Sequence, residues 1–172
     1  MATPMITNWK KIDASEDKDV NPTLYRQLIG SLMYLVNTRP DICYAVNTLS
    51  QFMVEPKGAH WAIAKHVLRY LQGTIDYGLL YTRSKDIRLS GFTYADWARS
   101  SMDRKSTSRC CFNIGSGMTS WCSRKQKSMA LSSSEVEYMV GRTTSCEAIW
   151  LRKLLVNLFK RNMEATRIMC DN

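Results

Sequence analysis

The spacing of the apolar residues changes near residue 77, and this change constrains the fold more than any other feature of the sequence. Before it, apolar residues recur every three or four positions, which is typical of helices with one buried face. Asn21 followed by Pro22 has the pattern of a helix N-terminus, and Gly73 is placed as a helix stop. We therefore expect helices over residues 21–37, from near 40 to 52, and over 59–72.

The second half of the chain has short runs rich in β-branched and aromatic residues, which favour strands. A serine at position 132, 133 or 134 can cap a long helix, which the apolar stripe from Val136 to Leu158 predicts, with a break between Gly141 and Cys146. The expected strands cover residues 77–83, 87–97, 109–115 and 118–124 before this helix, and 167–172 after it.

This order of elements predicts an α/β (α+β) fold in which a helical unit precedes a mixed sheet with a flanking helix. The first 20 residues are polar and charged and lack periodicity, so we expect a flexible lead-in there. The expected organisation is a lead-in over 1–20, a helical region over 21–76 and a sheet domain over 77–172.

Positive charge is concentrated in the second half of the chain. The net charge is +9, and 14 of the 24 lysines and arginines lie in residues 86–172. A basic cluster with interleaved aromatic residues favours a polyanionic partner such as a nucleic acid, although a solvated positive face is the alternative. The candidate nucleic-acid-binding residues are Arg99, Arg104, Lys105, Arg109, Arg124, Lys125 and Lys127.

The cysteines and the apolar runs indicate an intracellular protein, cytoplasmic or nuclear. The six cysteines include no C-x-x-C pair and no zinc-type spacing, so we expect reduced thiols. The N-terminus has no apolar core of signal-peptide length. The longest apolar candidate, "LIGSLMYLV", is about half the roughly 20 residues that a membrane span needs, so no membrane role is expected.

Seven segments of the sequence resemble one known family. They are "NPTLYRQLIGSLMYLVNTRPDICYAVNTLSQFM", "HVLRYLQGT", "ADWA", "DRKSTS", "SWCSRKQKSMALSSSEVEYM", "EAIWLRKLL" and "CDN". Together they resemble the Pol polyprotein of Ty1/copia retrotransposons, from the end of the reverse transcriptase through the RNase H domain. The resemblance implies that residues 1–85 are a connection-like region and that about 86–172 form an RNase H-like fold.

The activity that the resemblance implies is that of a divalent-metal-dependent endoribonuclease of the RNase H type. Its substrate would be RNA in an RNA–DNA hybrid or double-stranded RNA. The polymerase's own aspartate motif is not in this sequence, so we expect no reverse transcriptase activity. The sequence stops at "CDN", and the family's last strand, last helix and fourth metal-binding carboxylate are therefore expected to be missing. An uncovered sheet edge would then favour self-association.

The resemblance also implies a set of metal ligands, with one of them replaced. In the family the first motif reads Asp-x-Asp-Trp, and here its leading position is Tyr94, so we interpret Tyr94 as a lost ligand. Glu135 and Asp171 match carboxylates of the family pattern, and Asp96 is a displaced candidate. Two Mg²⁺ or Mn²⁺ ions are expected at such a site.

Two of these carboxylates have an alternative interpretation. Glu135 can instead complement the dipole of the helix that it begins, and Asp96 can accompany the lost ligand without replacing it. With Tyr94 in the motif, we expect cleavage to be impaired. Two other functions stay open: a duplex-RNA nuclease, binder or decoy retained by a host, for example against RNA viruses, and a retrotransposon remnant without function.

Overall fold

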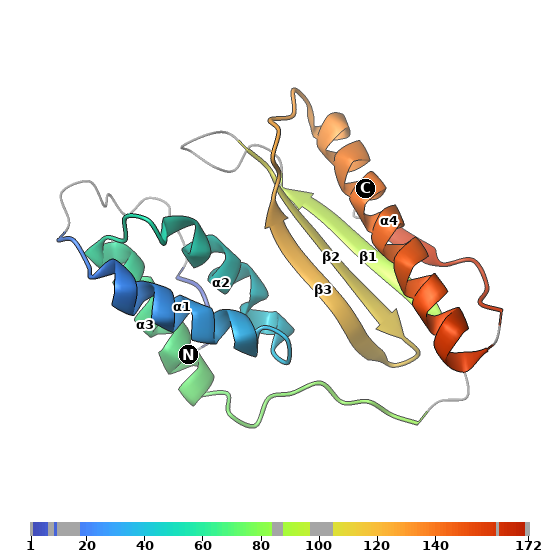
Figure 1. Cartoon of the computed structure of the whole chain (residues 1–172), viewed down its shortest axis with the longest axis horizontal. Coiled ribbons are helices and arrows are strands. Elements are labelled where there is room, and N and C mark those ends of the chain that lie inside the picture. Colours follow the sequence, from blue (N-terminus) through green and yellow to red (C-terminus); the bar gives the residue numbers. More distant parts are fainter. Residues whose placement is uncertain are drawn as a thin grey trace. The chain divides into compact units, whose positions relative to one another are not determined.

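The chain forms two compact units, residues 1–79 (unit 1) and 80–172 (unit 2), which Figure 1 shows as a helical part and a sheet with its helix. The computed structural model describes residues 2–6, 9, 18–83, 88–96, 105–160 and 162–170, with the side chain of Asp96 excepted. Within these residues, no helix is both long and apolar enough to cross a bilayer.

Unit 1 contains three α-helices in its described part. They are α1 (Pro22–Leu35), α2 (Cys43–Leu49) and α3 (Gly58–Gln72), and 3-10 turns at Pro40–Ile42 and Ser50–Phe52 flank α2. The predicted N-cap is confirmed, because the side chain of Asn21 accepts a hydrogen bond from the backbone N–H of Thr23 at 2.9 Å. The second predicted helix, from near residue 40 to 52, is in the structure one short α-helix between two 3-10 turns.

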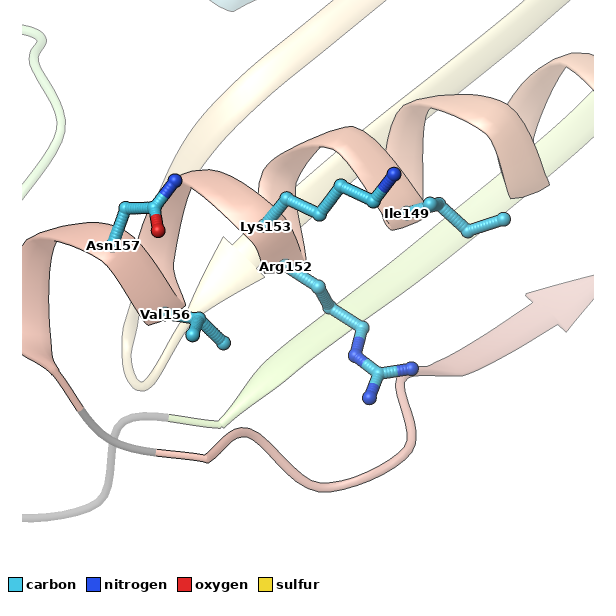
Figure 2. Close-up of a pocket in the computed structure, with 5 residues that line it drawn as sticks. All are labelled: Ile149, Arg152, Lys153, Val156 and Asn157. Carbon is cyan, nitrogen blue, oxygen red and sulfur yellow. The ribbon is translucent and has the colours of Figure 1, made fainter.

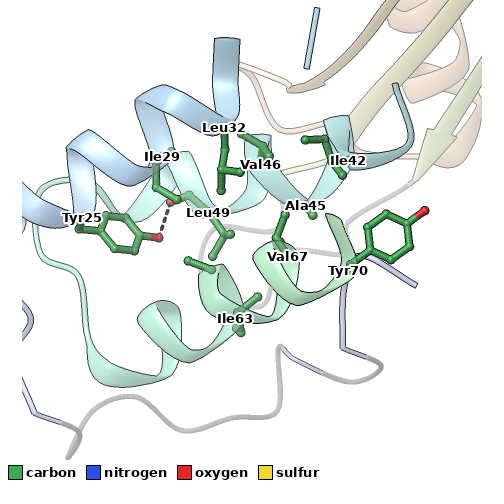
Figure 3. Packing of buried hydrophobic residues seen from close by; sticks show 11 residues of the cluster. Tyr25, Ile29, Leu32, Ile42, Ala45, Val46, Leu49, Ile63, Val67 and Tyr70 are labelled. Atoms are coloured by element: carbon green, nitrogen blue, oxygen red, sulfur yellow. Dashed lines mark hydrogen bonds between the residues drawn. The ribbon is translucent and has the colours of Figure 1, made fainter. Parts of the chain in front are cut away.

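The core of unit 1 fills the space between the three helices. Figure 3 shows Tyr25 from α1, Leu49 from α2 and Ile63 from α3 together in this core. The ring of Tyr25 is fully buried, and its hydroxyl donates a hydrogen bond to the backbone carbonyl of Leu49 at 2.9 Å. The buried phenol therefore has the partner that its polar atom requires.

A buried polar network closes the other end of this unit. Arg39 is 8% exposed, and its guanidinium donates to both carboxylate oxygens of Asp41 and to the backbone carbonyl of Thr74. The hydroxyl of Tyr70 donates to the same carboxylate at 2.9 Å. The network thus joins the start of the turn before α2 to the end of α3.

Unit 2 has four strands and one helix in its described part, which confirms the α/β prediction. They are β1 (Leu89–Asp96), β2 (Thr107–Ile114), β3 (Gly117–Lys125), α4 (Ser133–Phe159) and β4 (Arg167–Cys170). The sheet order is β3-β2-β1-β4, with β1 antiparallel to β2 and parallel to β4. The helix therefore connects β3 to β4 along one face of the sheet (Figure 1).

Two small apolar clusters and one polar contact hold α4 on the sheet. Phe112 on β2 is fully buried against Leu151 and Leu155, and Val136 and Val140 pack near Ala95 of β1. Between these clusters, the hydroxyl of Thr144 donates to the hydroxyl of Thr93 at 3.1 Å. Other contacts in the first cluster come from Leu89 and Ala148.

Two predictions about residues 77–172 are wrong. Residues 77–83 form no strand: Leu80 is 81% exposed, and Tyr81 instead donates its hydroxyl proton to the carbonyl of Met118 beside the β2–β3 turn. The helix is also unbroken between Gly141 and Cys146. The hydroxyl of Thr143 donates to the helix carbonyls of Met139 and Val140, so this polar side chain is accommodated within the continuous helix.

Candidate functional site

The candidate site lies where β1 ends, and Tyr94 is its central residue. Tyr94 is directly opposite Arg109 in the antiparallel β1–β2 ladder, and the Arg109 guanidinium carbon is 5.6 Å from the centre of the tyrosine ring. This distance is typical of a cation–π contact. A cation therefore lies beside the position at which the resembled family has an aspartate.

Tyr94 is on the sheet face that is turned away from α4. Its neighbours Thr93 and Ala95 both contact α4, Thr93 through Thr144 and Ala95 through the apolar cluster around Val136. Successive side chains of a strand point to opposite faces, so Tyr94 points to the other side, where it is 38% exposed. The phenol is accessible to a large partner.

Glu135 lies in the first turn of α4 and takes part in its N-terminal capping. Its backbone N–H donates to Oγ of Ser132 at 3.1 Å, and its carboxylate accepts a hydrogen bond from the N–H of Leu131 at 2.7 Å. These paired contacts resemble a capping box. The carboxylate is exposed, and the next residue, Val136, belongs to the cluster that contains Ala95. Glu135 therefore lies in the first turn of α4, near the end of β1.

The other two predicted ligands lie outside the described side chains. Asp96 is the last residue of β1, but its side chain is not described. Asp171 is not described, and the residue before it, Cys170, pairs with Thr93 on β1. The ligand roles of both aspartates stay predictions.

The described residues alone do not fit a two-metal centre. Among them, no group of three or more His, Cys, Asp and Glu side chains can hold a metal ion. Glu135 is the predicted carboxylate that has a described side chain, whereas Tyr94 offers a phenol beside a guanidinium. Divalent ions of the Mg²⁺ type require several oxygen ligands, mainly carboxylates and water. The described side chains therefore supply too few ligands for such an ion.

Predicted nucleic-acid-binding residues are brought together by the strand register at the same end of the sheet. Lys125 is opposite Thr107 and Arg124 is opposite Ser108, while Gln126 donates its backbone N–H to Ser106 at 2.9 Å. By strand alternation, Arg109 and Lys125 share the face of Tyr94, and Arg124 points to the other face. Lys105 and Lys127 directly flank these pairs, and Arg99 and Arg104 lie outside the described residues.

A cysteine pair on the neighbouring strands was missed by the sequence interpretation, which expected reduced thiols and found no C-x-x-C pair. Cys110 of β2 and Cys122 of β3 are register partners, with sulfur atoms 2.6 Å apart. A usable signal was present, because the two cysteines lie at similar separations from Gly115, whose positive φ of 57° marks the hairpin turn.

A pocket along the second half of α4 is a separate feature. Figure 2 shows its lining side chains, Ile149, Arg152, Lys153, Val156 and Asn157, projecting from one stretch of the helix. None of these is a carboxylate. Ile149 is 14 residues after Glu135, which corresponds to about 20 Å along a helix axis. The pocket is thus distant from the predicted ligand on α4.

No family model matches the chain, and no solved structure matches it significantly. Named relatives are found among curated proteins. The Retrovirus-related Pol polyprotein from transposon RE2 of Arabidopsis thaliana is 42% identical over 172 residues, which are 100% of this chain but 12% of the relative. The corresponding polyprotein from transposon TNT 1-94 of Nicotiana tabacum is 41% identical over 149 residues, which are 86% of this chain and 11% of the relative.

A shorter relative is matched over most of its length. The Secreted RxLR effector protein 161 of Plasmopara viticola is 48% identical over 128 residues, which are 74% of this chain and 90% of the relative. The polyproteins, in contrast, extend far beyond the matched region. With 41–42% identity over all or most of its length to these polyproteins, the chain belongs to the family of retrovirus-related Pol polyproteins from copia-type transposons.

Proposed function

We propose that this retrotransposon-derived protein binds RNA–DNA hybrid or double-stranded RNA through unit 2 and cleaves the RNA slowly, as an impaired RNase H-type endoribonuclease. The observation that carries the proposal is the position of the cations. Arg109, Arg124 and Lys125 lie on β2 and β3 beside the end of β1, where Arg109 is opposite Tyr94 and Ala95 packs near Val136 of α4. This position supports a binding surface near Tyr94 and the start of α4.

Phosphate contacts account for the proposed binding. Arg109 and Lys125 lie on neighbouring strands and share one sheet face, so they can contact phosphates of the same duplex. A-form duplexes are recognised through their backbone and 2′-hydroxyl groups, which requires no reading of bases. We therefore expect binding with little sequence preference.

The proposed ligands for Mg²⁺ or Mn²⁺ are Glu135, Asp96 and Asp171. A divalent ion supplies Lewis-acid and water-activating chemistry when it is bound in such enzymes. Tyr94 replaces the family's first aspartate by a phenol, which is a weaker ligand for a hard cation than a carboxylate. Slow cleavage is the consequence that this replacement predicts.

The test uses the purified full chain with labelled RNA–DNA hybrid, double-stranded RNA and double-stranded DNA of one sequence. Binding is followed by fluorescence anisotropy, and cleavage by gel electrophoresis with Mg²⁺, Mn²⁺ or EDTA. We expect binding to the two RNA-containing duplexes, with slow cleavage that EDTA stops. Absence of binding at low salt would contradict the proposal.

A second candidate function is binding without cleavage. It is favoured by the relative from Plasmopara viticola, because this chain matches 90% of a protein whose name describes a secreted effector, not a polymerase or a nuclease. One variant distinguishes the two candidate functions. If Glu135→Ala leaves binding intact and any RNA cleavage unchanged, the cleavage is not due to this site and the binding function is favoured.

A further inference from the structure

The strongest feature outside the proposed site is the contact between Cys110 and Cys122. They are directly opposite each other on β2 and β3, and their sulfur atoms are 2.6 Å apart. Both side chains are partly buried. Cys110 is also opposite Thr93, whose hydroxyl meets α4, so the pair lies on the face of the sheet that α4 covers.

We propose that Cys110 and Cys122 are a redox modification site, at which a small-molecule disulfide converts the two thiols into a reversible cross-strand disulfide. Directly opposed residues of an antiparallel ladder have Cα separations of about 4.5–5.5 Å, which lie within the range that disulfides span. Their sulfur atoms already face each other, so no change of strand register is needed.

The orientation of the neighbouring Cys111 excludes this thiol from the proposed pair. Cys111 is opposite Trp121, and by strand alternation its side chain points to the other face of the sheet. It is adjacent in sequence but is not directed toward Cys122. Cys110 and Cys122 thus lie on one face of the sheet, and Cys111 lies on the other.

The surroundings of Cys122 favour its ionisation and make it the attacking thiol. A hydrogen bond from the Cys110 thiol lowers the pKa of Cys122, and the positive charge of Arg124 acts in the same direction. Burial and the charge of Glu147 oppose this effect. The same hydrogen bond, together with burial, raises the pKa of Cys110. The thiolate is the nucleophile in thiol–disulfide exchange.

The reaction proceeds in two exchange steps. The Cys122 thiolate attacks one sulfur of the disulfide RSSR, which breaks the S–S bond, forms a mixed disulfide and releases RS⁻. Cys110 loses its proton to solvent and attacks the Cys122 sulfur, which forms the cross-strand bond and releases the second RS⁻. Two protein thiols are oxidised by two electrons, and RSSR is reduced to two thiols.

The experiment exposes the full chain to defined ratios of oxidised to reduced glutathione, followed by alkylation and mass spectrometry. Arg109 and Arg124 flank the pair in sequence, so trypsin releases residues 110–124 as one peptide that contains Cys110, Cys111 and Cys122. The variant Cys111→Ser leaves the proposed pair as the two thiols of this peptide. Its oxidised form is two hydrogens lighter and resists alkylation.

Matched variants determine which thiols react. We expect Cys111→Ser to form the bond with at least about tenfold less oxidised glutathione than Cys110→Ser, in which Cys111 and Cys122 remain. Denaturing the Cys111→Ser chain in urea should remove this advantage, because the strand register then no longer holds the sulfurs together. Circular dichroism checks that both variants are folded.

Two results would overturn the proposal. One is complete alkylation of Cys110 and Cys122 in the folded Cys111→Ser chain at glutathione ratios that modify the exposed Cys146. The other is equal oxidation of the folded and the urea-denatured chain. Neither result depends on nucleic-acid binding or cleavage, so the proposal is tested separately from the proposed function.

Discussion

The guanidinium of Arg109 is 5.6 Å from the centre of the Tyr94 ring, and the two residues are direct partners in the β1–β2 ladder. This arrangement gives the Tyr94 position two roles in the proposed function. The aromatic ring orders a cation that can contact phosphate, and it occupies the position of a carboxylate that the family uses. Binding and cleavage are therefore expected to respond differently to changes at this position.

The first prediction concerns the salt dependence of binding. Affinity for an RNA–DNA hybrid should fall steeply with salt, because each phosphate contact releases counterions. Replacing four cations by alanine should reduce the slope of log Kd against log salt by about one for each phosphate that is no longer neutralised. These cations are Arg104, Lys105, Arg124 and Lys125. Anisotropy titrations at several salt concentrations measure the slope.

A matched control removes the same number of cations from other parts of the chain. The exposed residues for this variant are Lys65, Arg69, Arg142 and Lys153. Both variants have the same net charge, so general attraction to polyanions is lowered equally. An equal reduction of the slope in both variants would mean that the end of the sheet is not the binding surface.

The second prediction concerns self-association at the edge strand β4. Met169 pairs with Phe92 of β1, and the two side chains are 38% and 40% exposed on one face. An apolar edge strand is a template for pairing with other chains, and a lysine on the edge opposes it. Met169→Lys should therefore lower concentration-dependent association in analytical ultracentrifugation. Met129→Lys, at a 54% exposed methionine outside the sheet, should leave it unchanged.

Local signals explain which parts of the fold were predictable from sequence. The caps at Asn21 and Ser132 were recognisable because they are local in sequence. The capping side-chain oxygen accepts a hydrogen bond from a backbone N–H within the next three residues. The strands of the β2–β3 hairpin were recognisable for the same reason, since their residue types and turn are close in sequence. These features depend on few long-range contacts.

Features that depend on distant partners were not predictable in the same way. The run at 77–83 has strand-like residues but pairs with no described strand, and its side chains instead contact residues at the β2–β3 hairpin turn. The contact of the middle of α4 with the sheet depends on Thr144 meeting Thr93, which is 51 residues away. The opposition of Tyr94 and Arg109 depends on strand register, which the motif alone does not specify.

The third prediction tests the packing of β1 against the core of unit 2. A Cβ at Gly91 would lie 2.7 Å from Cε1 of Phe112, whose side chain is fully buried. Gly91→Ala should destabilise unit 2 by about 1–3 kcal/mol through overpacking. Chemical denaturation measures this loss. Adding Phe112→Leu should cost less in the Gly91→Ala background than in the unaltered chain, because the smaller side chain relieves the overlap.

Gly141 provides the matched control for this prediction. It lies within α4, and a Cβ there would meet no atom within 4 Å outside its own helical turn and chain neighbours. Gly141→Ala should leave stability unchanged or raise it by up to about 1 kcal/mol, since alanine favours the helix. A similar loss for both alanine variants would contradict the packing argument at Gly91.

The fourth prediction is a pH dependence of unit 1. Burial raises the pKa of Asp41, but hydrogen bonds from Arg39 and Tyr70 outweigh it, so its pKa is lowered on folding. A lowered carboxyl pKa contributes stability above the unfolded value of about 3.9, and this stability is lost as the pH falls through the folded value. Hydrogen exchange of α2 and α3 amides should thus show falling protection below about pH 4.

The variant Asp41→Asn separates this carboxylate from the others. It should destabilise unit 1 by about 1 kcal/mol at pH 7, because it weakens the contacts with the buried Arg39 guanidinium. The difference from the unaltered chain should shrink as the pH is lowered, since the natural carboxylate is then protonated too. If the difference in the free energy of unfolding between the two chains is the same at pH 7 and pH 3, the effect is due to packing and not to the charge of Asp41.

The last prediction restores the family's aspartate at position 94. Tyr94→Asp should raise Mg²⁺- or Mn²⁺-dependent cleavage of an RNA–DNA hybrid by at least about tenfold, which requires about 1.4 kcal/mol of added transition-state stabilisation. Because Arg109 is opposite this position, the new carboxylate can also pair with the guanidinium. Adding Arg109→Gln should then raise cleavage further while weakening binding.

Two further variants show whether the predicted ligands act together. Glu135→Ala should abolish the gain that Tyr94→Asp produces, because the restored site would again lack a carboxylate. Asp96→Ala in the unaltered chain should reduce cleavage if Asp96 has taken over as a ligand. Suppose instead that the natural chain cleaves duplex RNA rapidly and that Tyr94→Asp leaves the rate unchanged. The reaction then uses other residues, and the interpretation of Tyr94 as a lost ligand is wrong.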